Sequence, residues 1–283
     1  MIHTTLVSTE LLEQNLRDWA ILDCRFDLAD EHWGRDQYRH GHIPGAVYAS
    51  LSHDLAGPRT ATSGRHPLPS IDALAAAFSR LGIDSRTQVV AYDQDSGLFA
   101  SRAWWCLRYL GHDAVALLDG GWAKWERERR AVASGDDSRA PRAFVPAPRA
   151  WMAVTVDEVE RRLGDRDTLL LDARGPDRFE GRSEPIDRVA GHIPGAANHF
   201  YRWNLDESGT LLDPAQLRER YRALLGGRPP EQAIMYCGSG VSACHNVLAM
   251  EIAGLPGTRL YVGSWSEWSK DPARAVETGP PPV

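Results

Sequence analysis

The sequence predicts an α/β protein built from two similar domains in tandem, each a parallel β-sheet flanked by α-helices. Three observations lead to this prediction. The chain has 283 residues, about twice the length of a common domain. Four motifs of its first half recur in the same order in its second half. In both halves, short apolar segments alternate with longer helical ones, which is typical of parallel sheets with both faces buried.

The internal repeat divides the chain into two equivalent halves. The hexapeptide GHIPGA at 41–46 recurs unchanged at 191–196, and such an identity within one chain is far beyond coincidence. The distance between the copies is too long for a solenoid of small repeats, so it indicates two domains. The other pairs are DCR at 23–25 with DAR at 172–174, VVAYD at 89–93 with AIMYC at 233–237, and LLDGGWAKW at 117–125 with LYVGSWSEW at 260–268.

Strand-like and helix-like segments follow the same order in each half. The strands expected in the first half are 20–23, 88–92 and 114–118, and the helices are 71–82 and 98–111. The strands expected in the second half are 168–172, 233–236 and 259–262, and the helices are 156–163, 214–227 and 241–254. Four glycines fall where a helix would end in a left-handed residue, namely Gly82, Gly111, Gly226 and Gly254.

A proline-rich segment separates the two halves. Pro141, Pro146 and Pro148 lie in a stretch without amphipathic period, as is typical of a linker. We therefore expect an N-terminal domain at 1–140, a linker at 141–153 and a C-terminal domain at 154–283.

Composition excludes several classes of function. A formal charge of −6 provides no field to hold a polyanion, so nucleic acid is not expected as a partner. No apolar stretch reaches bilayer length, and the N-terminus does not resemble a signal peptide, so we expect a cytoplasmic protein without a membrane segment. Four cysteines without paired spacing indicate neither a disulfide framework nor a zinc site. No metal and no organic cofactor is expected.

The residues best placed for chemistry follow the expected strand 233–236. Ligands of parallel sheets bind beyond the carboxyl ends of the strands, and the sequence there is CGSGVSA, beginning with Cys237. Gly238 and Gly240 allow main-chain N–H groups to turn toward one point, and a helix that begins near Ser242 adds the positive end of its dipole. Such a loop stabilises an anion, and it favours the thiolate form of Cys237.

Spacing decides among three cysteine chemistries. Cysteine phosphatases need an arginine six residues after the nucleophile, where this chain has Ala243. A nucleophile elbow of the hydrolase type needs glycine two residues before the nucleophile, where this chain has Met235. Sulfur transfer remains, in which the Cys237 thiolate accepts a sulfane sulfur and the loop N–H groups hold the resulting persulfide.

The chain has duplicated α/β domains, an Asp-x-Arg motif and a GHIPGA motif in each half, and CGSGVS in the second half. In these features it resembles the two-domain rhodanese family of sulfurtransferases. The resemblance covers nearly the whole chain. CGSGV is similar to the loop of the 3-mercaptopyruvate sulfurtransferases, whereas thiosulfate-using members generally have basic residues directly after the cysteine. The position that matches Cys237 in the first half is Asp93, so the resemblance implies a catalytically silent N-terminal domain.

The resemblance also implies roles for residues outside the loop. Arg178 matches the first of two family arginines that bind the substrate anion, and Arg188 is the nearest match to the second, one residue later than the pattern. His66 matches a histidine that reaches the active site, where it would address the hydroxyl of Ser239. The main chain of the loop would complete substrate binding through Gly238, Gly240, Val241 and Ser242.

Together these observations predict a sulfurtransferase that moves sulfur from 3-mercaptopyruvate to a thiol or to cyanide through a persulfide on Cys237. The donor would be a small anion, and thioredoxin is a candidate acceptor. Two alternatives stay open, a thiosulfate:cyanide sulfurtransferase and a non-enzymatic rhodanese module that binds partners or carries sulfur. Thiosulfate needs positive charge beside the cysteine, and the loop itself supplies none. His42 and His192 occur in both halves and are expected to fix turns, and Cys244 is expected to pack inside a helix.

Overall fold

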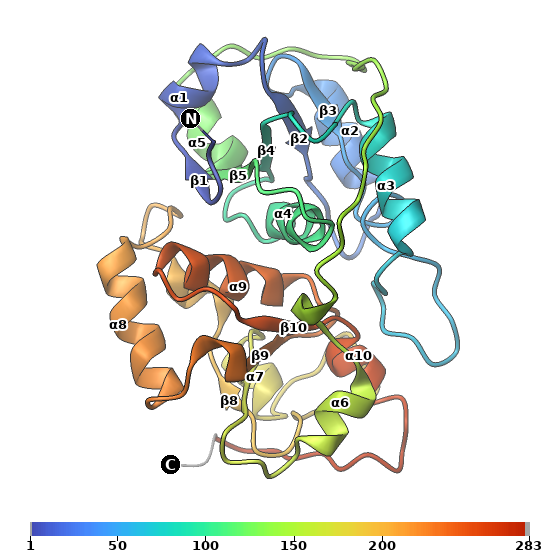
Figure 1. Cartoon of the computed structure of the whole chain (residues 1–283), viewed down its shortest axis with the longest axis vertical. Helices are drawn as coiled ribbons and strands as arrows, with labels where there is room; N and C mark the ends of the chain where they lie inside the picture. Colours follow the sequence, from blue (N-terminus) through green and yellow to red (C-terminus); the bar gives the residue numbers. More distant parts are fainter. Residues whose placement is uncertain (1, 281–283) are drawn as a thin grey trace. The chain divides into compact units, whose positions relative to one another are not determined.

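The computed structural model describes residues 2–280, and these form two compact units (Figure 1). The first unit consists of the chain up to Gly57, Pro69–Arg149 and Glu207–Leu211. The second unit consists of Pro58–Leu68, Ala150–Asp206 and the chain from Leu212 onward. The segment Pro58–Leu68 therefore packs with the second unit, although it precedes the expected linker by more than 70 residues.

A five-stranded parallel sheet forms the centre of the first unit, in the order β1-β5-β4-β2-β3. Its strands are β1 (Leu6–Val7), β2 (Ala20–Asp23), β3 (Ala46–Tyr48), β4 (Val89–Tyr92) and β5 (Val115–Leu118). Its helices are α1 (Thr9–Gln14), α2 (Trp33–His40), α3 (Ile71–Arg80), α4 (Ala100–Tyr109) and α5 (Gly121–Arg127). Leu12 of α1 and Trp125 of α5 pack in one core with Ile21 and Val90 of the sheet, and α4 packs on β4 and β5. Both faces of the sheet are therefore covered.

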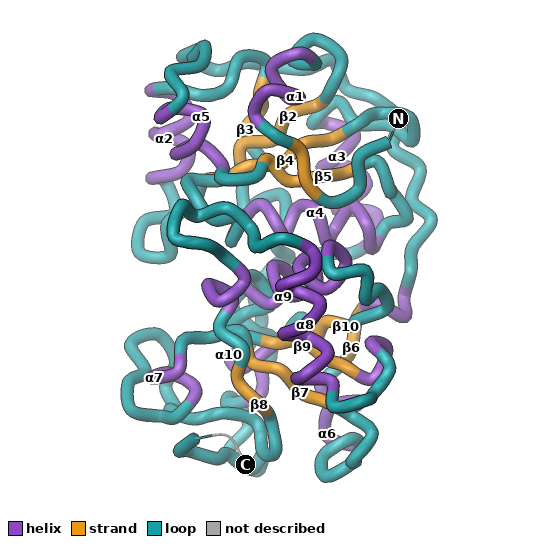
Figure 2. Tube along the Cα trace, turned by 90° about the vertical axis from the view of Figure 1, so that its left-hand side faces the viewer, coloured by secondary structure: helices purple, strands orange, loops and turns teal. Residues whose placement is uncertain are grey.

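The second unit has the same architecture, in the order β6-β10-β9-β7-β8. Its strands are β6 (Ala153–Val154), β7 (Leu169–Asp172), β8 (Ala197–Asn198), β9 (Ala233–Tyr236) and β10 (Arg259–Tyr261). Its α-helices are α6 (Val156–Arg161), α7 (Pro176–Phe179), α8 (Pro214–Leu225), α9 (Ser242–Ile252) and α10 (Ser264–Trp268), and its 3-10 helices are Ala150–Met152, Tyr201–Asn204 and Pro230–Gln232. In both views α8 and α9 lie on one face of this sheet and α6 and α10 on the other (Figure 2).

The repeated motifs hold the same place in both sheets. Arg25 is bound to Asp23 and to the carbonyl of Gly41 at 2.6 Å, and its guanidinium lies 4.7 Å from the ring of Trp122. The second unit repeats this arrangement, because Arg174 binds Asp172 and the carbonyl of Gly191 and lies 4.9 Å from the ring of Trp265. The Asp-x-Arg motif therefore ties the end of a strand to the GHIPGA turn, a structural role that both halves need.

The histidines of the two turns are structural as well. Nδ1 of His42 donates a hydrogen bond of 2.8 Å to the carbonyl of Tyr38, and the imidazole stacks on the Tyr38 ring; His192 does the same with Phe179. Both imidazoles are buried. The expected turn-fixing role agrees with these contacts.

Most predicted elements are present with ends shifted by a few residues, and the predicted α/β duplication is confirmed. All four predicted terminal glycines have positive φ, between 57° at Gly226 and 86° at Gly111. The sequence analysis missed the short strands β1, β3, β6 and β8 and the helices α1, α2, α5, α7 and α10, because periodicity needs a longer segment to be visible. Among residues 2–280, no helix combines the length and the apolar character needed to cross a membrane.

Candidate active site

Cys237 is the first residue after β9, and it is 2% exposed. Its main chain is held on both sides. Its N–H donates to Oγ of Ser264 over 3.1 Å, and its carbonyl accepts from the N–H of Trp265 over 2.9 Å. The next carbonyl, of Gly238, accepts from the N–H of Ser266 over 2.9 Å. The start of α10 therefore fixes where the loop after β9 leaves the sheet.

Gly240 turns the loop back toward α9. Its φ is +73°, and a Cβ at this position would lie 2.3 Å from the carbonyl oxygen of Val262. Only glycine fits both requirements. Val241 then caps α9, which begins at Ser242 as predicted. The loop is therefore a short, tight connection between the end of β9 and the N-terminus of α9.

The main-chain N–H groups of this loop are available to an anion. Those of Gly238, Ser239, Val241 and Ser242 have no acceptor within residues 2–280. Because buried N–H groups are nearly always paired in folded proteins, this set of donors beside Cys237 is typical of a binding site. The N-terminus of α9 adds its dipole at the same place.

The first unit shows where the equivalent of Cys237 lies. The carbonyl of Asp93 accepts from the N–H of Trp122 over 2.9 Å, just as the carbonyl of Cys237 accepts from Trp265. Asp93 is the residue after β4, and Cys237 is the residue after β9, its counterpart in strand order. The two residues therefore occupy equivalent positions.

The carboxylate of Asp93 fills the loop of its own unit. It accepts main-chain hydrogen bonds from Gly97 at 2.9 Å, Phe99 at 2.7 Å and Ala100 at 3.1 Å. Burial raises the pKa of Asp93 to about 6 in spite of these donors, which lower it, so the carboxylate is the form present at neutral pH. In the first unit an internal anion thus satisfies the loop donors, whereas in the second unit the corresponding loop carries the thiol of Cys237.

Ser239 carries the hydroxyl of the loop, and His66 lies against it. Nδ1 of His66 is 2.8 Å from Oγ of Ser239, and both residues are buried. His66 belongs to the segment Pro58–Leu68 of the second unit. The N–H of Arg65 donates to Oγ of Ser266 over 2.9 Å, which anchors this segment beside the loop. The structure therefore brings together Cys237, Ser239 and His66, as the sequence analysis expected.

Arg178 reaches the same loop from α7. Its guanidinium donates to both carboxylate oxygens of Glu184, at 2.8–3.2 Å, and to Oδ2 of Asp187 at 3.1 Å. A Cβ built on Gly238 would lie 3.5 Å from both terminal nitrogens of Arg178. A small residue after Cys237 therefore leaves room for this cation.

Sequence analysis missed Arg65 as a residue of this site. One of its terminal nitrogens would lie 2.7 Å from a Cβ on Gly238, and its guanidinium pairs with Asp187. Although the loop itself supplies no cation, as expected, the fold places two guanidinium groups beside it. The only signal in the sequence was that Arg65 directly precedes His66.

Two carboxylates balance these two cations. Burial alone would raise the pKa of Glu184, but hydrogen bonds from Arg178 and from the N–H groups of Asp187 and Ile186 lower it below its ordinary value. Asp187 accepts from Arg65 through one oxygen and from Arg178 through the other. The pair of arginines is therefore oriented by carboxylates and carries little net charge.

Arg188 lies farther out than expected. It is exposed and lines a cavity of about 660 Å³ together with Arg65, whereas no contact places it beside Gly238.

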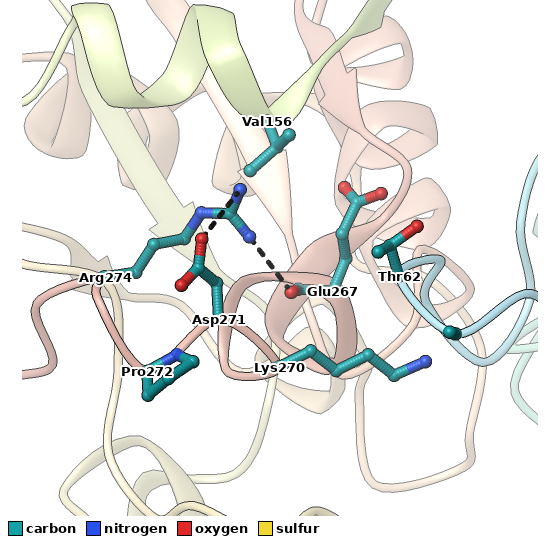
Figure 3. A pocket seen from close by; sticks show the side chains of 8 residues that line it. Thr62, Val156, Glu267, Lys270, Asp271, Pro272 and Arg274 are labelled. Atoms are coloured by element: carbon teal, nitrogen blue, oxygen red, sulfur yellow. Dashed lines mark hydrogen bonds and ion pairs between the residues drawn. The ribbon is translucent and has the colours of Figure 1, made fainter.

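A second cavity, of about 410 Å³, lies between α6 and α10 (Figure 3). There Arg274 contacts Asp271 at 3.8 Å and the carbonyl of Glu267 at 3.4 Å.

The other three cysteines are also buried. Sγ of Cys244 lies 3.3 Å from the carbonyl oxygen of Gly240, inside α9. Burial raises the pKa of Cys24 and Cys106, which keeps them as unreactive thiols near neutral pH.

A buried cysteine in a loop of free N–H donors, within one of two duplicated α/β units, defines a class of proteins that transfer groups through a thiolate. Comparisons with known proteins make this specific. The model of the rhodanese-like domain matches residues 8–128 and 155–271. A relative from Pseudomonas aeruginosa, named probable 3-mercaptopyruvate sulfurtransferase, is 48% identical over 264 residues, which cover 93% of each chain.

Two further comparisons agree with this result. A Mycobacterium tuberculosis relative, named putative thiosulfate sulfurtransferase SseB, is 40% identical over 92% of this chain and 91% of its own. The crystal structure of SseA from Escherichia coli, described with the rhodanese fold and mechanism of 3-mercaptopyruvate sulfotransferases, has a TM-score of 0.79 and 30% identity. It covers 94% of this chain and all of that one. The chain belongs to the rhodanese family and is a two-domain sulfurtransferase, as predicted.

Proposed function

We propose that this sulfurtransferase takes sulfur from 3-mercaptopyruvate onto Cys237 and passes it from the persulfide to a thiol or to cyanide. The observation that carries the proposal is the hydroxyl of Ser239, which lies 2.8 Å from Nδ1 of His66 and belongs to the same loop of N–H donors as the buried Cys237, two residues earlier. The names of the Pseudomonas aeruginosa and Escherichia coli relatives support the same donor.

The chemistry of this donor requires a hydroxyl. The Cys237 thiolate attacks the sulfur of 3-mercaptopyruvate, a sulfur–sulfur bond forms, and the carbon–sulfur bond breaks. Its electron pair passes into the enolate of pyruvate, which then takes up a proton. The hydroxyl of Ser239 donates a hydrogen bond where the enolate oxygen develops negative charge, and His66 sets the direction of that hydroxyl.

Arginine side chains bind the rest of the donor in this proposal. Arg178 and Arg65 both lie beside Gly238, and a guanidinium binds a carboxylate through two parallel hydrogen bonds. The N–H groups of Gly238, Gly240, Val241 and Ser242 serve the sulfur that becomes the persulfide. A donor-binding role for Arg188 stays a prediction.

Charge balance favours 3-mercaptopyruvate over thiosulfate. Thiosulfate is a dianion that must approach a thiolate, so it needs excess positive charge. Near the loop, Arg65 and Arg178 are compensated by Glu184 and Asp187. A near-neutral cluster of oriented donors suits a monocarboxylate better.

Intact-protein mass spectrometry tests the persulfide. Protein mixed with 3-mercaptopyruvate should gain the mass of one sulfur, Cys237→Ser should gain none, and the matched variant Cys244→Ser should behave as wild type. Steady-state kinetics with both donors then test the substrate, and kcat/KM should be higher for 3-mercaptopyruvate. Equal sulfur loading of Cys237→Ser and wild type would refute the nucleophile, and a better rate with thiosulfate would refute the donor alone.

The same loading experiment separates an enzyme from a binding module. A non-enzymatic carrier would accept sulfur without turning over, so multiple turnovers with an added thiol distinguish the two. Thioredoxin as the acceptor and a cytoplasmic location stay predictions.

A further inference from the structure

The cavity that contains Arg188 lies directly beside the active-site loop. Its walls come from the segment Pro58–Leu68, from the stretch between α7 and β8, and from α10 with the residues that follow it. All of these belong to the second unit. Its lining consists of Ala61, Arg65, Ile186, Asp187, Arg188, Val189, Ser266, Ser269, Lys270 and Pro272.

Two lining residues join the cavity to the Cys237 loop. The N–H of Ser266 donates to the carbonyl of Gly238 over 2.9 Å. Arg65 lies against the α-carbon of Gly238, and its own N–H is bound to Ser266. The inner end of the cavity is therefore adjacent to the residue that follows the nucleophile.

The cavity carries uncompensated positive charge. Its single carboxylate, Asp187, is occupied by Arg65 and Arg178 through its two oxygens. Lys270 donates to the neutral carbonyls of Ser63 and Thr60. Neither Lys270 nor Arg188 forms an ion pair with any residue of 2–280. Two cations thus line a cavity that an organic anion would enter with favourable Coulomb energy.

The cavity also has an apolar wall and is too large for the donor. Ile186 is 42% exposed and Val189 is 37% exposed, and aliphatic surface of this kind binds carbon chains. A volume of about 660 Å³ lies within the range of sites that hold organic ligands of considerable size, whereas 3-mercaptopyruvate, thiosulfate and cyanide each have only a handful of non-hydrogen atoms. The donor alone therefore leaves most of the cavity unused.

We infer that this cavity is the acceptor subsite and that it binds a low-molecular-weight thiol carrying carboxylate groups. The inference rests on the proposed function and deepens it. The acceptor thiolate attacks the outer sulfur of the persulfide, the bond between that sulfur and Cys237 breaks, and Cys237 leaves as the thiolate. The product is the persulfide of the acceptor, so electrons balance without an added oxidant or reductant. Arg188 and Lys270 bind the acceptor carboxylates, and Ile186 and Val189 contact its carbon chain.

The second cavity lacks these properties, although it shares Lys270 (Figure 3). Its guanidinium, on Arg274, is paired with Asp271 and with Glu160. Glu267 and Asp271 add negative charge to its walls. An anionic acceptor is therefore directed to the cavity beside Arg65.

The test separates the two halves of the reaction. Full-length protein is first loaded with 3-mercaptopyruvate, the persulfide is quantified by intact mass, and excess donor is removed. The second-order rate constant of persulfide loss is then measured with dianionic mercaptosuccinate, neutral 2-mercaptoethanol and cationic cysteamine. A failure to load refutes the proposed function, whereas the acceptor inference concerns only the second step.

The decisive quantity is the rate constant for mercaptosuccinate divided by that for cysteamine, measured on the same protein. A substitution that harms the site in general slows both thiols equally, so its effect cancels in this ratio. Lys270→Gln should lower it by about two- to fivefold, the range for one exposed charge pair, and Lys270→Arg should restore it. Ile186→Glu should lower it further than the uncharged Ile186→Gln. The control Arg182→Gln removes a 61% exposed arginine outside the cavity and should leave the ratio unchanged.

Arg188→Gln distinguishes the two roles considered for that residue. The inference expects a lower ratio of the acceptor rate constants, whereas the role implied by family resemblance expects slower loading by 3-mercaptopyruvate. If the ratio is the same in wild type, Lys270→Gln and Ile186→Glu, the cavity is not an acceptor site. Persulfide loss that needs a protein thiol and is insensitive to all three small thiols would also overturn the inference.

Discussion

Nδ1 of His66 lies 2.8 Å from Oγ of Ser239, a hydrogen bond between residues 173 positions apart in the sequence. Both side chains are almost completely buried, so the hydroxyl is protected from competing water and has a defined direction. In the proposed reaction the Ser239 hydroxyl, oriented by His66, donates a hydrogen bond to the enolate oxygen. Arg178 and Arg65 bind the carboxylate of 3-mercaptopyruvate. The site thus combines the loop of Cys237 after β9 with groups from two other segments, Pro58–Leu68 and α7.

Ser239→Ala should lower kcat/KM for 3-mercaptopyruvate roughly a hundredfold or more, the usual effect of removing one hydrogen-bond donor to a developing oxyanion. His66→Ala should have a similar effect, and the double variant should be little worse than either single one, since the two act as a unit. Thiosulfate forms no enolate and should be affected much less. Equal losses with both donors, or full additivity, would contradict the assigned role.

Arg178→Ala should lose about 2–4 kcal/mol of transition-state stabilisation with 3-mercaptopyruvate, as for a charge-paired contact left without its partner. Steady-state kinetics measure this loss as a change in kcat/KM. Arg182→Ala is the matched control, because Arg182 is 61% exposed and pairs with Asp177 and Glu180 at the surface. Similar kinetics for both variants would mean that Arg178 only stabilises the fold.

Gly240→Ala should destabilise the protein and slow alkylation of Cys237 by iodoacetamide. The new Cβ would lie 2.3 Å from the carbonyl oxygen of Val262, so the loop and its N–H groups must shift. Gly227→Ala controls for backbone strain alone, because its φ is +88° with nothing within 4 Å of its Cβ position. Thermal unfolding and alkylation rates should show a larger change at Gly240. Equal behaviour of the two variants would show that the close approach to Val262 is unimportant.

Glu184→Gln should destabilise the protein at neutral pH by about 1–3 kcal/mol, because a buried charged hydrogen bond to Arg178 is lost. The pKa of Glu184 is lowered in the folded state from its ordinary value of 4.5. Its contribution is therefore fully present above about pH 4.5 and is lost as the pH falls through the lower, folded-state pKa.

Thermal unfolding between pH 7 and pH 3 measures this dependence. The difference between wild type and Glu184→Gln should be largest at neutral pH and should shrink in acid. Glu180→Gln removes a carboxylate that pairs with exposed Arg182, so it should cause a small change. A difference that grows as the pH falls would have the wrong sign for a carboxylate stabilised by Arg178.

Features that depend on local sequence could be predicted. Alternating strand and helix patterns, and glycines at helix ends, report the backbone directly, so both sheets were expected with their central strands. Cys237 could be placed at a binding edge because a parallel sheet collects the carboxyl ends of its strands at one side. The loop glycines were predicted by the same reasoning, but the limits on space around them come from distant segments, because a Cβ on Gly240 would meet Val262 and a Cβ on Gly238 would meet Arg65.

The sequence by itself therefore determined the duplicated α/β fold and the place of Cys237 and its glycine-containing loop directly after β9. Only the tertiary structure decided which cations surround that loop. Arg65 reaches Gly238 because hydrogen bonds such as the one from its N–H to Ser266, 201 residues away, hold its segment in the second unit. Arg188 matches the position of a family arginine better than Arg65 does, yet it lines the cavity of about 660 Å³ beside the loop. Within a strand or helix, the spacing of residues in the sequence decides to which side a side chain points. The position of a loop side chain depends instead on packing between segments that are far apart in the chain.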